Sequence, residues 1–385
     1  MECENVKIVP FDRADPTVWN RLVDESSEAW LYNRTEWVRL EASIYQNESF
    51  MVLSDDEQPL GVFVVYLSSR GPRRFGDRFL FTGRNGPAMV EGLGSTQRQA
   101  VMDFSLSYLK ERAQIYRANR LEVHLPPLAP AYLPPLRSEV NPLLEYGFNA
   151  LPMYGSTTGI KRLQGIHTPT RIVELQTGDE EHLFAACSHA CRNVVRKAVR
   201  AGVTSVQDTG PAGLEAFYIA YEASYRRSGS EMKSFAFFQK MLESLAEKGR
   251  INIFLSTHQG KNVASAVLLC YKNAVTYYAG GLDYEAHHLS PHNLLLWETL
   301  KWARREGCRW FEMGPYFPYL PEDSKMARIG SFKCEFGGSS FLLFEGVLLY
   351  SWPTYVAGAL LEEAKGWLHS RTRRFVHYVQ RGERQ

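Results

Sequence analysis

The feature that most constrains the fold of this chain is an internal repeat at a distance of about 190 to 200 residues. In each half, three strand-like segments separated by short turns precede a long helical pattern and one further short strand. The first-half segments are residues 50–54, 60–67, 78–82, 96–117 and 121–125, and the second-half segments are residues 251–256, 263–271, 274–280, 291–306 and 309–313. The repeat predicts two similar α/β (α+β) domains, each with a mixed sheet flanked by helices.

Composition excludes several classes of protein. The chain has 385 residues, of which 45% are hydrophobic and 13% aromatic, so it carries enough apolar surface for two packed domains. A formal net charge of +2 gives no general attraction to DNA. No segment approaches the roughly 20 apolar residues of a membrane helix, and the amino terminus lacks the pattern of a secretory signal. A cytoplasmic protein is expected.

The cysteines and histidines form two groups that raise the question of a metal site. These groups are Cys187 and Cys191 with His182 and His189, and His287, His288 and His292. The first lacks the paired CxxC spacing of zinc sites, and the second lacks a patterned carboxylate or cysteine partner. We therefore expect buried thiols on one helix face, histidines at a helix entry, and no metal.

A series of short motifs follows in order between residues 191 and 338. They are Arg192-Asn-Val-Val-Arg196-Lys197-Ala198, Phe237-Phe-Gln-Lys-Met241, Tyr278-Ala-Gly-Gly-Leu-Asp283, Leu294-Leu-Leu-Trp-Glu-Thr-Leu-Lys-Trp-Ala303, Phe311-Glu-Met-Gly314 and Phe332-Lys333-Cys-Glu-Phe336-Gly-Gly338. In this order and spacing they resemble the Fem family of peptidoglycan bridge aminoacyltransferases, in its compact branch. The resemblance implies two tandem GNAT-like acyltransferase domains at residues 1–160 and 165–345, followed by a C-terminal helix with a basic end at residues 346–385.

The same resemblance implies roles for residues of the last motif. In the Fem family the lysine of the Phe-Lys element lies in the active site, which makes Lys333 a catalytic candidate and Phe332 a substrate contact. The Lys333 ammonium would stabilise charge that develops on a carbonyl, or a phosphate of the donor. Tyr278 matches an active-site tyrosine of the family. Without the motif, Lys333 would be interpreted as a solvated lysine and Tyr278 as a half-buried strand aromatic.

Basic residues are the candidates for phosphate binding. Lys233 stands where family members carry a residue that binds the diphosphate of the murein precursor, and Arg39, after Trp37, resembles a first-domain contact to the same group. Arg192 and Arg196 lie four residues apart, so they share one helix face that suits a precursor or the end of a tRNA. A merely solvated charged face is the alternative for this pair.

Carboxylates supply the candidate general base, because proton transfer needs a group whose pKa burial can raise. Asp283, Glu312 and Glu335 meet that description, and Asp283 is taken as the catalytic candidate. The sequence at residues 312–315 is Glu-Met-Gly-Pro, where the family carries Asp-x-Gly-Gly. This departure is expected to reshape the acceptor pocket.

The donor remains open between an aminoacyl-tRNA and an acyl-coenzyme A, with no tightly bound cofactor expected. Ordinary GNAT enzymes hold the coenzyme A pyrophosphate on backbone amides of a glycine-containing loop. The corresponding residues 288–294 here are His-Leu-Ser-Pro-His-Asn-Leu and contain no glycine. This loop is evidence against ordinary acetyl-coenzyme A binding.

The predicted function is transfer of an acyl or aminoacyl group to an amine of a cell-envelope or polysaccharide precursor, with lipid-linked precursors and aminoacyl-tRNA as partners and no DNA. One alternative is an acyl-coenzyme A-dependent N-acetyltransferase acting on an amino sugar. A second alternative is a non-catalytic protein that binds the precursor or tRNA, in which Lys333 and Tyr278 would be ligand contacts.

The basic end of the chain generates a first testable prediction. Arg371, Arg373 and Arg374 would hold the protein near anionic lipid, with a contribution of about 1 kcal/mol for each charge. Replacing the three by Ala should therefore reduce co-sedimentation with anionic vesicles and leave sedimentation with neutral vesicles unchanged. Equal sedimentation of the variant with anionic vesicles would contradict this membrane contact.

Overall fold

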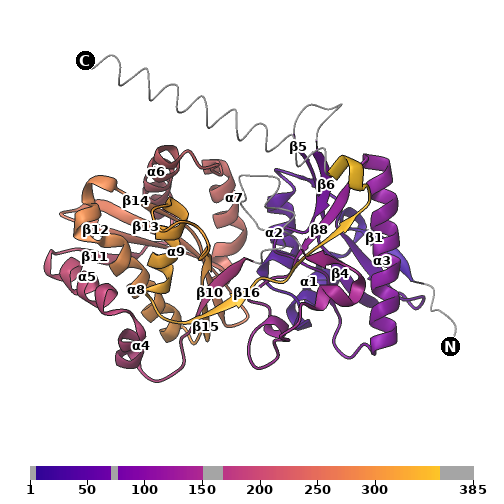
Figure 1. Ribbon diagram of the computed structural model, residues 1–385, viewed down its shortest axis with the longest axis horizontal. Helices are drawn as coiled ribbons and strands as arrows, with labels where there is room; N and C mark the ends of the chain where they lie inside the picture. The colour runs from indigo at the N-terminus through magenta and orange to yellow at the C-terminus, as the bar shows by residue number, and fades with distance from the viewer. Residues whose placement is uncertain (1–5, 71–76, 151–167, 356–385) are drawn as a thin grey trace, which may run out of the picture.

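The computed structural model describes residues 6–70, 77–150 and 168–355, which form two lobes side by side (Figure 1). One lobe contains the first half of the chain and the other contains most of the second half. Helices pack on a mixed sheet in each lobe, so the predicted α/β fold class is confirmed. Within the described ranges, no helix is both long and apolar enough to cross a membrane.

The second lobe is built on a seven-stranded sheet with the order β11-β12-β13-β14-β15-β10-β16. Its strands are β10 (Pro169–Glu174), β11 (Thr204–Gln207), β12 (Ile251–His258), β13 (Lys261–Tyr271), β14 (Ala274–Leu282), β15 (Trp310–Pro315) and β16 (Ser339–Leu342). Its helices are α4 (Glu180–Ala186), α5 (His189–Arg200), α6 (Pro211–Ser228), α7 (Phe235–Leu245), α8 (Pro291–Arg305) and α9 (Lys325–Cys334). The central strand β13 is covered on both faces, which explains its long apolar run.

The first lobe has two sheets with the orders β1-β3-β4-β7 and β2-β5-β6-β8-β17-β9. Its strands are β1 (Lys7–Pro10), β2 (Gln46–Asn47), β3 (Phe50–Leu53), β4 (Pro59–Phe63), β5 (Tyr66–Arg70), β6 (Asp77–Phe81), β7 (Ala88–Met89), β8 (Arg120–His124), β9 (Asn149–Ala150) and β17 (Glu345–Leu349). Its α-helices are α1 (Pro16–Glu25), α2 (Thr35–Glu41) and α3 (Ser95–Tyr116). The predicted segment 60–67 is thus divided between β4 and β5, one in each sheet.

One strand crosses between the lobes. β17 follows the second lobe in sequence but pairs with β8 and β9 of the first lobe, and Figure 1 shows this last strand crossing between the lobes. β10 is the first strand of the second lobe, where it pairs with β15 and β16. β10 and β17 occupy equivalent places, because each lies antiparallel beside a strand that is itself parallel to β14 or to β6. The chain returns to the first lobe at residue 345, where the predicted second domain ends.

Two local features complete the second lobe and the end of the chain. Helices α4 and α5 are separate at Cys187, because Ser188 caps α5 by accepting a hydrogen bond from Cys191 N at 3.0 Å and donates its own N–H to Glu335 O at 2.7 Å. Residues 346–349 are strand rather than C-terminal helix, and helix appears at residues 352–355. The rest of the predicted helix, with Arg371, Arg373 and Arg374, lies outside the described residues.

Side chains also join the lobes, and Lys272 makes three hydrogen bonds between them. It lies in the β13–β14 turn of the second lobe, and its ammonium donates hydrogen bonds to the carbonyls of Val23, Ser26 and Ala29 at the end of α1. Carbonyls at a helix end have no partner within the helix, so a cation satisfies them well. Nearby, Trp30 Nε1 donates to Tyr271 O at 2.9 Å.

Replacing Lys272 by Met should destabilise the protein by about 1–3 kcal/mol, because it leaves buried carbonyls without a donor. Urea unfolding measures the change. Lys261→Met is the matched control, since that lysine contacts Asp283 at the surface and should contribute less than about 1 kcal/mol. Equal unfolding midpoints for the two variants would contradict the role of Lys272 in joining the lobes.

Candidate active site

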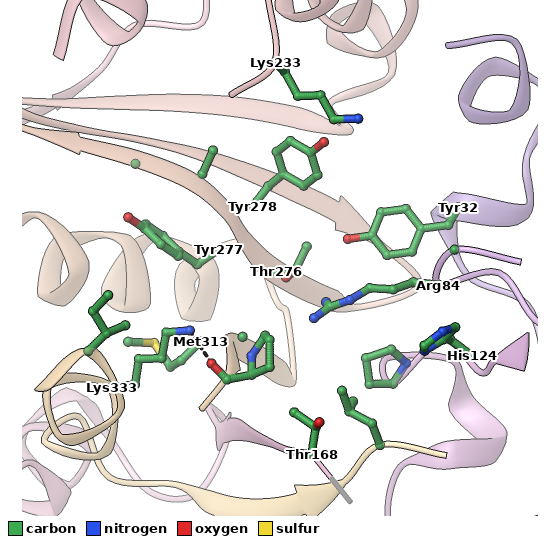
Figure 2. A pocket seen from close by; sticks show the side chains of 18 of the residues that line it. Tyr32, Arg84, His124, Thr168, Lys233, Thr276, Tyr277, Tyr278, Met313 and Lys333 are labelled. Carbon is green, nitrogen blue, oxygen red and sulfur yellow. Dashed lines mark hydrogen bonds between the residues drawn. The ribbon is translucent and has the colours of Figure 1, made fainter. Parts of the chain in front are cut away.

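A cavity of about 880 Å³ lies between the lobes and is lined by residues of both. Figure 2 shows Tyr32, Arg84 and His124 of the first lobe facing Tyr277, Met313 and Lys333 of the second. The floor comes from β14 and β15, at the point where these parallel neighbours separate. Crevices of this kind are where α/β sheets commonly bind ligands.

Lys333 lies in the last turn of α9 and lines the cavity. Its Nζ donates a hydrogen bond to Pro315 O at 2.7 Å (Figure 2). Burial lowers the pKa of Lys333 to about 8, while the negative charge of Glu312 opposes that shift. The alternative of a solvated lysine does not describe this residue, because its ammonium is held in the cavity.

The Glu-Met-Gly-Pro sequence at residues 312–315 determines how closely Lys333 can approach the end of β15. A bulge interrupts the pairing of β10 with β15, and Gly314 adopts a φ of +88°, which favours glycine. A Cβ on Gly314 would lie 3.1 Å from Lys333 Nζ. The glycine therefore lets the ammonium lie directly against the strand end.

Glu312 is a buried carboxylate whose oxygens are both engaged. Its side chain accepts hydrogen bonds from Arg84 Nη1 at 3.1 Å, from Thr170 at 2.7 Å and from Thr276 at 2.8 Å. These donors come from the first lobe and from two strands of the second. Glu312 is thus suited to holding Arg84 at the cavity rather than to accepting a proton from an amine.

Two neighbouring tyrosines of β14 line the cavity, because a bulge between the pairs of Val267 and Leu268 shifts the register at Tyr278. The Tyr277 hydroxyl lies 3.1 Å from His292 Nε2, and burial lowers the pKa of His292 to about 4, so its ring is neutral at pH 7. A Cβ on Gly280 would fall 1.8 Å from the Tyr277 hydroxyl, so only glycine leaves room for that ring.

The predicted Tyr278 packs between the lobes. Its ring meets Trp37 of α2 edge-on at 5.6 Å and Phe238 of α7 at 6.4 Å. Burial raises the pKa of the Tyr278 hydroxyl well above its usual value, so this group is a hydrogen-bond donor and not a base.

Lys233 and Phe332 also line the cavity. Lys233 precedes α7, and its Nζ lies over the rings of Tyr45 at 5.4 Å and Phe237 at 5.0 Å. Phe332 packs edge-on against the His292 ring at 5.5 Å. The structure therefore brings Lys233, Tyr278, Phe332 and Lys333 to one cavity.

Other predicted residues lie elsewhere. Arg39 lines a separate hollow beside Glu36 and Lys248, although Trp37 of the same helix reaches the cavity. Asp283 caps the turn that follows β14 and pairs with Lys261 at 2.6 Å, and this hydrogen bond lowers the pKa of Asp283. Asp283 does not line the cavity and its lowered pKa makes it a weaker base, and its catalytic role stays a prediction.

The basic face of α5 is also away from the cavity. Arg192 donates hydrogen bonds to the carbonyls of Ala185 and Cys187, which ties α4 to α5. The Arg196 guanidinium lies over the Phe184 ring at 5.2 Å. These contacts give both arginines a structural explanation, and their binding to a precursor or tRNA stays a prediction.

The histidines considered for metal binding contact different partners, whereas the Cys187 and Cys191 thiols contact each other. His287 and His288 each contact a backbone carbonyl of their own turn, whereas His292 contacts Tyr277. Among the residues that the structure describes, no group of three His, Cys, Asp or Glu side chains is placed to hold a metal ion.

The sequence analysis did not single out Arg84, His124 or Glu345, which also line the cavity. Arg84 follows β6, while His124 ends β8 and Glu345 begins β17. The internal repeat offered a signal for His124, because residues 121–126 correspond to residues 310–315, which end at the cavity. The sequence gives no such signal for Glu345, because its position depends on the return of β17 to the first lobe.

Comparison with known proteins agrees with this architecture. Residues 186–319 match the family described as the acetyltransferase (GNAT) domain. This part of the chain is a GNAT-type acyltransferase domain. A comparison of the sequence with curated proteins finds no match.

Solved structures extend the GNAT likeness to the whole chain. The crystal structure of FemX matches with a TM-score of 0.67 at 14% identity, over 92% of this chain and 100% of that chain. The C-terminal domain of a putative lysylphosphatidylglycerol synthetase from Agrobacterium fabrum matches with a TM-score of 0.55 at 13% identity, over 91% and 95% of the two chains. A tandem GNAT protein from the clavulanic acid biosynthesis pathway matches at 0.52 and 12% identity, over 90% and 98%. At these identities the matches establish a tandem GNAT fold, which confirms the fold implied by the Fem resemblance.

The environment of Lys333 at the cavity predicts its titration. Lysine-labelled protein followed by NMR should show Lys333 titrating near pH 8, well below Lys261, whose pKa its Asp283 partner raises. Arg84→Met should raise the pKa of Lys333, because it removes a nearby positive charge and frees the charge of Glu312. A Lys333 signal that titrates with Lys261, or that ignores the Arg84 substitution, would contradict the arrangement.

Proposed function

We propose that this protein is an N-acyltransferase that transfers an acyl or aminoacyl group to an amine of a cell-envelope or polysaccharide precursor. The observation that carries the proposal is the position of the Lys333 ammonium, which is held by Pro315 O in a large cavity walled by the GNAT domain. A cation held at that place meets charge that develops on an acyl carbonyl oxygen.

The reaction needs one bond formed and one broken. The nitrogen of the acceptor amine attacks the acyl carbonyl carbon, and the carbonyl oxygen gains negative charge that Lys333 stabilises. The bond from that carbon to the ester oxygen or thioester sulfur of the donor then breaks. The amine loses one proton and the leaving group takes up one proton, so the exchange is balanced overall.

The beginning of α8 supports a donor other than coenzyme A. Ser290 precedes the helix with a φ of 54° and makes no capping hydrogen bond through its side chain, and Pro291 has no N–H to offer a phosphate. Both residues line the cavity. An aminoacyl ester, such as the charged end of a tRNA, needs no pyrophosphate site at this helix.

The opposite side of the cavity supports an acceptor that carries phosphate. Lys233 lies just before the first residue of α7 and carries a compact positive charge, which would bind a phosphate group as a point charge. Two structures with this fold are named FemX and a putative lysylphosphatidylglycerol synthetase. Their likeness supports an envelope-directed reaction for this chain.

Mass spectrometry of the purified protein incubated with charged tRNA, acyl-coenzyme A and candidate amine acceptors tests the proposal. A product whose mass equals the acceptor plus the acyl group minus one hydrogen supports it and identifies the donor. Binding of these compounds without any product would instead favour a non-catalytic protein.

Lys333 and Lys233 should differ in their effects on the reaction. Lys333→Ala should lower kcat on the order of 100-fold, because it removes a charge that acts on the developing oxyanion. Lys233→Ala should mainly raise KM, because it removes an interaction made equally before and during transfer. Steady-state kinetics with the donor and acceptor found above measures both, with Lys261→Ala as a surface control.

The central assignment fails if folded Lys333→Ala keeps full kcat. Lys333→Arg refines the test, since it keeps the charge and displaces it. A rate close to wild type for Lys333→Arg would show that the position of the ammonium matters little.

A further inference from the structure

Strand β17, which returns to the first lobe, carries a carboxylate at the cavity that has no role in the proposed reaction. Glu345 is the first residue of β17 and lies opposite His124 in the register with β8. Both residues line the cavity, and Glu345 is 2% exposed. Its Oε1 lies 3.0 Å from His124 Nδ1.

The second carboxylate oxygen is the unusual one. Glu345 Oε2 is buried and has no hydrogen-bond partner among the described residues. A buried charged oxygen without a donor is costly, so such an atom commonly marks a place where a ligand supplies one. Glu312 shows the contrast, because there the chain itself supplies donors to both oxygens.

The other carboxylates of the cavity have resident cations. Glu122 accepts a hydrogen bond from Arg120 Nε at 2.6 Å. Glu41 lies close enough to Lys233 for that ammonium to lower its pKa, against the larger effect of burial. Glu345 faces a histidine instead, so its free oxygen is left for a cation that comes with the ligand.

We propose that Glu345, positioned by His124, is the subsite that binds a primary ammonium group of the substrate. This inference rests on the proposed function, which supplies two sources for such a group: the α-ammonium of an aminoacyl donor or the amine of the acceptor. In either case the ammonium donates to Oε2 and neutralises the carboxylate. His124 keeps Oε1 occupied and fixes the direction in which Oε2 points.

Ligand-observed NMR with two pairs of probes tests the subsite without turnover. The first pair is 3′-alanylamino-3′-deoxyadenosine, a stable mimic of a charged tRNA end, and its N-acetyl form. The second pair is glucosamine and N-acetylglucosamine. We expect one ammonium probe to bind at least about tenfold more tightly than its acetylated partner, and the pair that shows this preference identifies the source.

Glu345→Gln, which keeps the shape and removes the charge, should abolish that preference. Glu345→Asp, which withdraws the oxygens by one methylene group, is a second variant and should lose most of it. Glu122→Gln is the matched control, because this carboxylate also lines the cavity but is already paired, and it should keep the full preference. Circular dichroism confirms folding of each variant.

Two results would overturn the proposal: no preference for either ammonium probe in the wild-type protein, or a preference that persists in folded Glu345→Gln. The first needs no variant, so a folding failure cannot obscure it. The outcome is separate from that of the proposed function, because transfer is detected as product mass whereas this subsite is detected as binding. Product formation with an unchanged preference in Glu345→Gln would reject the subsite alone.

Discussion

The return of β17 to the first lobe is the constraint on which the rest of the structure depends. β17 fills the place between β8 and β9. The sheet of the first lobe therefore contains backbone hydrogen bonds that only a strand following the second lobe supplies. The chain thus leaves the first lobe, forms the second and returns, and the cavity is lined by residues of both.

Interactions between side chains of the two lobes follow from that pairing. The buried pair of Arg84 and Glu312 would be expensive if it were left to two charges alone, since desolvation offsets much of their attraction. Hydrogen bonds from Thr170 on β10 and from Thr276 on β14 satisfy the remaining capacity of the carboxylate. Both donors lie on the strands that flank β15, so the strand order places them beside Glu312.

Local sequence patterns predicted the long helix and the following strand of each half, and the meander of the second half, to within a few residues, because hydrophobic periodicity records which side of an element is buried. They did not predict the division of segment 60–67 between two sheets of the first lobe. They could not predict the return of β17 to the first lobe, since the pattern of residues 345–349 does not say which sheet they join. The site divides in the same way. Lys333, Tyr278 and Lys233 came from motifs, whereas His124 and Glu345 are 221 residues apart and meet only through the pairing of β8 with β17.

Arg84 decides what Lys333 can do. A free Glu312 would attract the Lys333 ammonium and hold its charge, because that carboxylate raises the pKa of Lys333. Arg84 instead occupies Glu312, so Lys333 rests on the carbonyl of Pro315, which is a neutral acceptor. The positive charge of Lys333 is then available to a ligand. A residue of the first lobe thus sets the electrostatic state of a lysine in the second lobe, which gives the first lobe a chemical role as well as a structural one.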